Sequence, residues 1–157
     1  MATDIKHIEF NKVLLVLFEE IYQKVDGFIL NKGTSLKESL SDISFEQASK
    51  PLIKDGSTIA SHVEHIDFYM KVMNDYMHGK WYDKVDWSKS WQTKSVSVDE
   101  WENLKTKLTN TQDTVLNFIK SIDDWNDDKK LGGALGILTH TAYHLGAIRQ
   151  LMSVVTK

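Results

Sequence analysis

Apolar residues recur every three or four positions along four long stretches of the chain. The first stretch covers residues 4–30, and the others cover residues 59–78, 98–122 and 133–155. The first stretch contains Ile5, Ile8, Val13, Leu14, Leu17, Phe18, Ile21, Val25, Phe28 and Ile29. This period is typical of an amphipathic helix, which buries one face and exposes the other. Four long helices of similar length predict an all-α protein, a four-helix bundle that forms a single domain over residues 1–157.

Local signals indicate where these helices begin and end. Gly33 follows the last apolar residue of the first stretch, which predicts a helix stop there. Thr58 precedes the second stretch as an N-cap candidate, and residues 97–100 have the spacing of a capping box at the start of the third. Residues 44–47 have the same spacing, which predicts a short connector helix ending near Pro51, the single proline of the chain.

An aromatic-rich linker over residues 79–96 separates the second and third long helices. It contains Trp81, Tyr82, Trp87 and Trp91 within eleven residues. The linker exceeds the ~2–8 residues that a bundle loop needs, so we expect it to pack as an ordered flap. Its rings are either a ligand platform or a cover for the end of the bundle or a dimer surface, and we favour the cover.

Composition argues against several classes of protein. The chain has no cysteine, so it has no disulfide and no thiolate metal ligand. Its 19 Lys and Arg against 22 Asp and Glu argue against general nucleic-acid binding, which needs a basic surface. The sequence has no run of the ~20 apolar residues that cross a membrane. It begins without a signal-peptide pattern, so we expect a cytoplasmic protein.

Four of the six histidines form two close pairs on predicted helices. His140 and His144 are four residues apart, and His62 and His65 are three apart. Each spacing places both imidazoles on one helix face, where they can converge on one ion. Such pairs are also common in helical proteins that bind no metal. The apolar residues that flank them favour a partly buried site, where unpaired imidazoles need hydrogen-bond partners or a metal.

Two common kinds of metal site do not fit these histidines. A zinc protease needs glutamate directly after the first histidine of its motif, and this chain has Thr141 there. Di-iron bundles need glutamate three residues before a histidine, which none of the four paired histidines has. A mononuclear site with three histidines and open coordination positions remains. Such a site is catalytic in pattern, because it can activate bound water or a bound thiol.

Three stretches of the chain resemble the DinB-like (DinB/YfiT) superfamily. Residues 58–65 resemble the family's second-helix signature, in which a metal-binding histidine lies seven residues after an N-cap. Residues 140–148 resemble its closing segment, in which two histidines are four residues apart. The short helix over residues 44–50 also has a counterpart. The chain departs from the family pattern at Ala147, where glutamine is common.

The resemblance implies a divalent metal, typically zinc or nickel, held by His65, His140 and His144. His62, one turn before His65, is then an orienting partner of a ligand, a fourth ligand or a substrate contact. Characterised relatives include thiol-dependent transferases and isomerases that use low-molecular-weight thiols, and relatives are often dimers. We therefore expect a homodimeric, metal-dependent transferase or hydrolase that acts on a small molecule and binds neither nucleic acid nor membrane.

A second hypothesis is a dimeric helical module without catalysis. It binds a ligand or a partner protein through the aromatic linker, and metal is absent or incidental. The two hypotheses differ in whether a chelator changes thermal stability, because a tightly bound metal stabilises the folded state.

Overall fold

The computed structural model describes residues 7–80 and 82–156, which form helices joined by loops, with no strand among them. The elements in chain order are α1 (His7–Tyr22), α2 (Leu36–Ser41), α3 (Phe45–Ala48), α4 (Ile59–Met77), the 3-10 helix η1 (Trp87–Trp91), α5 (Val98–Lys120) and α6 (Asp128–Val155). The predicted all-α class is confirmed for this part of the chain.

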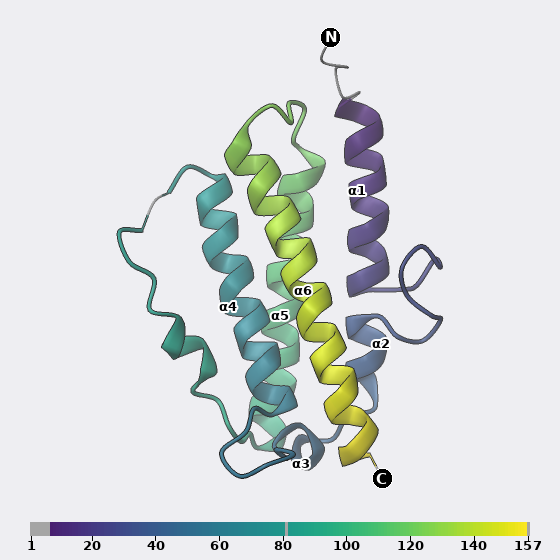
Figure 1. Cartoon of the computed structure of the whole chain (residues 1–157), viewed down its shortest axis with the longest axis vertical. Helices are drawn as coiled ribbons and strands as arrows, with labels where there is room; N and C mark the ends of the chain where they lie inside the picture. The colour runs from purple at the N-terminus through teal and green to yellow at the C-terminus, as the bar shows by residue number, and fades with distance from the viewer. Residues whose placement is uncertain (1–6, 81, 157) are drawn as a thin grey trace.

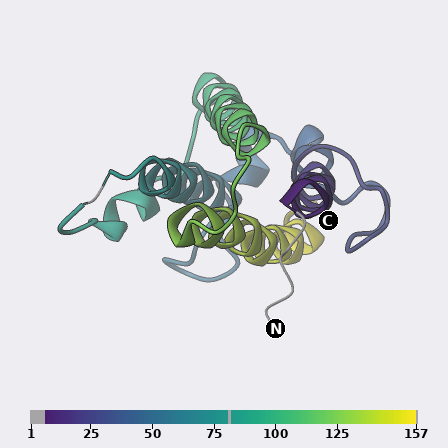
Figure 2. The same ribbon diagram turned by 90° about the horizontal axis from the view of Figure 1, so that it is seen from above.

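Four of these helices, α1, α4, α5 and α6, are long and run along the long axis of the molecule (Figure 1). Helix α4 packs against α5 and α6, and α1 packs against the same two helices. The view from above places α4 and α1 on opposite sides, with α5 and α6 between them (Figure 2). This arrangement brings the histidine-bearing helices α4 and α6 into direct contact.

Three predicted helix starts are confirmed by side-chain caps. The side chain of Thr58 accepts the N–H of Ser61, and the Ser61 hydroxyl accepts the N–H of Thr58 in return. Capping boxes also open α3 at Ser44 and α5 at Ser97, as their spacing predicts. Helix α6 begins at Asp128, before the predicted start at residue 133, because the preceding Asp127 side chain caps it.

The first helix is shorter than predicted. The pattern predicts a helix over residues 4–30, but α1 ends at Tyr22, and residues 4–6 lie outside the described residues. The side chains of Phe28 and Ile29, assigned to the buried face of that helix, are 69% and 53% exposed. The apolar period over these last residues therefore does not reflect a helix.

A buried carboxylate explains why the chain turns back at this point. The Glu20 side chain accepts the backbone N–H groups of Phe28, Ile29 and Leu30 at 2.9, 2.8 and 2.6 Å. Gly27 makes the turn with a φ of +93°, which glycine adopts without strain. Gly33, predicted to stop this helix, also has a positive φ, but it lies in the loop before α2, a helix that the apolar pattern does not predict.

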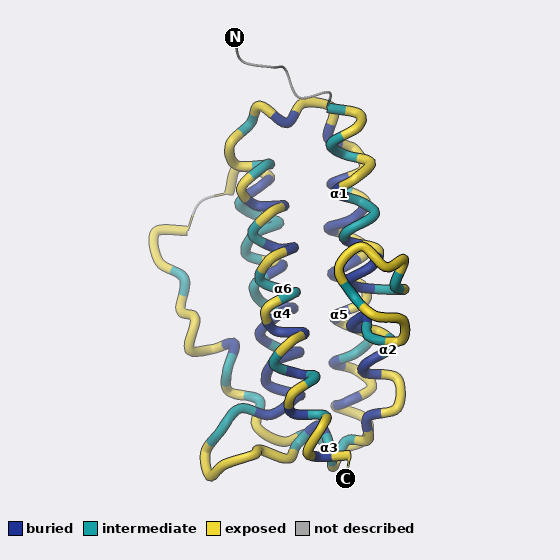
Figure 3. The backbone as a smooth tube through the Cα atoms, turned by 45° about the vertical axis from the view of Figure 1, so that its right-hand side comes forward, coloured by how far each residue is buried: buried dark blue, intermediate teal, exposed yellow. Residues whose placement is uncertain are grey.

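The core lies between the four long helices. Buried positions follow the helix sides that face one another, whereas the loop after α1 is largely exposed (Figure 3). The largest fully buried side chains include Trp101, Tyr22, Phe18, Ile66, Met70 and Ile137. Among the described residues, no helix combines the length and apolar character that crossing a bilayer requires.

Candidate metal centre

Both predicted histidine pairs lie at the interface between α4 and α6. His62 and His65 project from α4, and His140 and His144 project from α6. The Thr58 cap fixes the start of α4, and the two histidines of that helix follow within its first two turns. Because both helices are regular here, each pair shares one face and meets the other pair across the interface.

Three imidazole nitrogens converge at this interface. The Nε2 atom of His140 lies 3.1 Å from Nε2 of His65 and 3.2 Å from Nε2 of His144. Ligand atoms from all three residues lie within 4.8 Å of one another. Nitrogens bound about 2.0–2.1 Å from a zinc ion in tetrahedral geometry lie roughly 3.3 Å apart. The three histidines that the family resemblance assigns can therefore hold a metal ion.

The other ring nitrogens have different partners. His65 Nδ1 lies 2.7 Å from the Ser90 hydroxyl, and His144 Nδ1 lies 2.9 Å from Nδ1 of His62. His62 Nε2 in turn lies 3.1 Å from the hydroxyl of Ser57. His140 Nδ1 is buried and has no hydrogen-bond partner. His62 thus contacts a candidate ligand rather than joining the three converging nitrogens.

Burial keeps these histidines neutral near pH 7. Burial, reinforced by the nearby charges of His65 and Lys94, lowers the pKa of His62 to about 4. Burial and His65 lower the pKa of His140 to about 4, and burial with the three neighbouring histidines lowers that of His144 to about 3. Burial also lowers the pKa of His65. Neutral imidazoles have the free lone pairs that a metal ligand needs.

Aromatic rings enclose the four histidines. The Trp91 ring stacks on His65 with the ring centroids 4.1 Å apart, and it meets the His62 ring edge-on at 5.2 Å. Tyr69 of α4 stacks on His140 at 3.6 Å. These contacts restrict the orientations of the imidazole rings and limit the access of water to the site.

The aromatic linker therefore lies along the side of α4 (Figure 1), with η1 against the histidines. The interpretation of the linker as a cover for the end of the bundle is wrong for this segment. Trp81 lies outside the described residues. Ser90 and Ser57 contact the histidines but were not predicted as site residues. Ser90 is 25 positions from His65, so only a tertiary contact reveals it, whereas Ser57 is five positions before His62.

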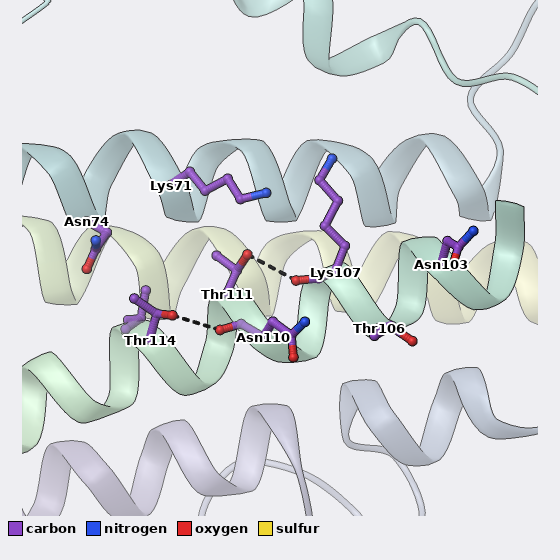
Figure 4. A pocket seen from close by; sticks show the side chains of 9 residues that line it. Lys71, Asn74, Asn103, Thr106, Lys107, Asn110, Thr111 and Thr114 are labelled. Atoms are coloured by element: carbon purple, nitrogen blue, oxygen red, sulfur yellow. Dashed lines mark hydrogen bonds between the residues drawn. The ribbon is translucent and has the colours of Figure 1, made fainter.

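A polar groove of about 430 Å³ lies elsewhere, between α4 and α5. It includes Lys71 and Asn74 of α4 and Lys107 and Thr111 of α5, and Figure 4 shows these side chains along the two helices. No histidine lines it. Lys71, Lys107 and Thr111 of this groove belong to a separate cluster, which is centred on a carboxylate.

The carboxylate of this second cluster belongs to Asp67, which is 1% exposed. It accepts the Thr111 hydroxyl at 2.6 Å, and its other oxygen lies 2.7 Å from Lys71 Nζ and 3.3 Å from Lys107 Nζ. The charge of Asp67 is therefore already balanced by two lysines. The cluster therefore needs no ligand to balance its charge, although it borders this groove.

The histidine centre has the donors for a divalent cation bound by three neutral nitrogens. Three protein ligands leave coordination positions free for water or a substrate, which is the arrangement of catalytic zinc sites. A centre of this kind can lower the pKa of a bound water or thiol. Comparison with protein-family models, with curated proteins and with solved structures gives no match to this chain.

Proposed function

We propose that the chain is a DinB-like four-helix bundle that binds a divalent metal, zinc or nickel, through His65, His140 and His144. One observation carries the proposal: the Nε2 atoms of three neutral, largely buried histidines from two helices converge at 3.1 and 3.2 Å. Such lone pairs repel one another unless a proton or a cation lies between them. A cation satisfies all three at once.

The proposed activity is that of a metal-dependent enzyme, a thiol-dependent transferase or a hydrolase acting on a small molecule. The metal supplies Lewis acidity, which favours the thiolate or hydroxide form of a molecule bound to it. Because the chain has no cysteine, a thiol nucleophile has to come from a cosubstrate. Trp91 and Tyr69 keep the ligand histidines in place and restrict the access of bulk water.

Elemental analysis of tag-free protein tests the metal site. We expect close to one zinc or nickel ion per wild-type chain and almost none in the His140→Ala/His144→Ala double variant. His78→Ala is the matched control, because His78 is exposed at the end of α4 and lies outside the cluster. Equally little metal in the wild type and the double variant contradicts the proposal.

A second assay tests the proposed activity. A panel of low-molecular-weight thiols is incubated with electrophilic acceptors and hydrolysable esters, with and without chelator. We expect turnover that is lost with chelator and in the double variant. A protein that binds metal but turns over nothing in this panel supports the non-catalytic module instead.

A further inference from the structure

We propose that His62 and Ser90 are positioning residues of the histidine centre, which fix the protons of His144 and His65 on Nδ1. The inference rests on the proposed metal site and adds to it the placement of each ring proton. A neutral imidazole has one N–H, so a proton on Nδ1 leaves a lone pair on Nε2. Outer hydrogen bonds of this kind fix the orientation of metal-binding histidines.

The proton of His65 follows from the hydrogen bonds of Ser90, which is fully buried. The Ser90 hydroxyl donates its only proton to the backbone oxygen of Trp87 at 2.7 Å. It can therefore only accept from Nδ1 of His65, which lies 2.7 Å away. The proton of His65 is thus on Nδ1, and its Nε2 lone pair faces the two histidines of α6.

The proposal places the proton of His144 on Nδ1, an assignment that two contacts accommodate. Nδ1 of His144 and Nδ1 of His62 are 2.9 Å apart, so one of them is the donor. If His144 donates, His62 has its own proton on Nε2, where the Ser57 hydroxyl accepts it at 3.1 Å. Both nitrogens of His62 and Nδ1 of His144 then have hydrogen-bond partners. Both nitrogens of His62 are engaged, which leaves neither for a metal.

His140 then differs from the other two candidate ligands. Its Nδ1 has no partner, and its Nε2 faces the lone pairs of His65 and His144. In the metal-free protein, the contacts among the three Nε2 atoms are satisfied when His140 has its proton on Nε2 and donates to these lone pairs. Metal binding then requires the loss of this proton from Nε2 and the gain of one at Nδ1, with no net proton release.

Long-range ¹H–¹⁵N correlation spectra of the full chain with ¹⁵N-labelled histidine report these tautomers directly. In metal-free protein we expect Nδ1–H for His65 and His144, and Nε2–H for His62 and His140. On addition of Zn²⁺, we expect His140 alone to change to Nδ1–H. A metal-free spectrum in which His65 or His144 has its proton on Nε2 overturns the proposal.

Zn²⁺ affinity, measured by competition with a chromophoric chelator, tests the same residues by substitution. We expect His62→Ala and Ser90→Ala to weaken binding about 10- to 100-fold, as loss of outer partners of ligands does. His62→Asn can still place an amide oxygen near His144 Nδ1, so it recovers part of the affinity. Ser88→Ala is the matched control, because Ser88 is exposed in the same turn and bonds to Asp86 instead.

The outcomes separate this inference from the proposed function. A wild type that binds neither Zn²⁺ nor Ni²⁺ overturns both. A wild type that binds Zn²⁺, with both alanine variants folded by circular dichroism and binding equally tightly, overturns only the positioning roles. Weaker Zn²⁺ binding by both alanine variants, with Ser88→Ala unchanged, supports the positioning roles.

Discussion

Two polar clusters flank α4, one toward α6 and one toward α5. The first contains four histidines, kept neutral by burial, and the Nε2 atoms of three of them converge. The second contains the buried Asp67 carboxylate, which is paired with Lys71, Lys107 and Thr111. The groove beside the second cluster has a volume of about 430 Å³. The charges of the cluster itself are already balanced by its ion pairs.

The comparison favours converging nitrogen lone pairs, rather than the size of a cavity, as the sign of a ligand site. Buried polar groups are normally satisfied, and the Asp67 cluster follows this rule within the protein. In the histidine cluster, two Nε2 lone pairs lack any partner except the proton of a third imidazole. The four predictions below test this contrast, beginning with the largest expected effect.

Zinc ions should stabilise the protein only through the histidine cluster. With free Zn²⁺ about 100-fold above Kd, the free energy of unfolding should rise by about 2.7 kcal/mol. Urea denaturation with and without Zn²⁺ measures this gain. His140→Ala/His144→Ala should show none of it, while Asp67→Asn should show all of it. An equal gain in the double variant means that zinc binds elsewhere.

Removing the carboxylate of the second cluster should reduce stability without affecting the first. Asp67→Ala leaves the Thr111 hydroxyl and two half-exposed lysines without their shared partner. We expect a loss of about 1–2 kcal/mol in urea denaturation, since the lysines can turn to solvent. Zn²⁺ affinity should stay unchanged. Asp113→Ala, at an exposed position of α5, is the control and should change stability by less than about 0.5 kcal/mol.

A third buried group, the Glu20 carboxylate, extends the comparison to pH. Burial raises its pKa, but hydrogen bonds from the backbone N–H groups of residues 27–30 outweigh this, so the pKa lies below its ordinary value of 4.5. Its contribution to stability is therefore present above about pH 4.5 and is lost as the pH falls through the lowered pKa.

Glu20→Gln should be less stable than the wild type at neutral pH and should lose less on acidification. The loss of stability at neutral pH should be smaller than for Asp67→Ala, because glutamine keeps one acceptor oxygen and a similar volume. Thermal unfolding of both proteins between pH 7 and pH 3 measures the two curves. Parallel curves would show that Glu20 does not couple stability to pH.

Two glycines of α6 give the smallest predicted effect. A Cβ at Gly136 would lie 3.1 Å from the hydroxyl of Tyr69, the residue that stacks on His140, whereas a Cβ at Gly146 would meet nothing within 4 Å. Gly146→Ala should raise stability by up to about 1 kcal/mol, the gain in helix propensity. Gly136→Ala should gain less stability, because the new methyl group forces Tyr69 to shift. Since Tyr69 stacks on His140, we also expect Zn²⁺ binding to weaken a few-fold. Equal Zn²⁺ affinities in the two variants would show that Tyr69 does not position His140.

The parts of the fold that the sequence predicts are those that local chemistry determines. The starts of α4 and α5 are signalled by Thr58 and Ser97, whose side chains cap backbone groups within three residues. The end of α1 depends on Glu20 reaching N–H groups eight to ten residues later, which the apolar period cannot show. Helix α2 had a local signal that was missed, the capping-box spacing of Ser35 and Glu38.

The residues of the candidate site are likewise predictable only where local sequence spacing determines their positions. Helical spacing and the family resemblance identify His65, His140 and His144, because each pair lies on one regular helix. Ser90 lies 25 positions beyond His65, and its contact depends on how the linker folds back onto α4. The spacing of residues in a loop does not determine their place in space, so no pattern identifies this serine.

The linker between α4 and α5 has a consequence for how the protein can change in evolution. The three candidate ligands lie on two packed helices, where a substitution that shifts the backbone disturbs the core. The cover over them, with Trp91 and Ser90, comes from a loop whose other residues are largely exposed. Loops tolerate replacement, insertion and deletion better than packed helices do. Most of residues 82–96 can therefore change without disturbing the two packed helices that carry the histidines.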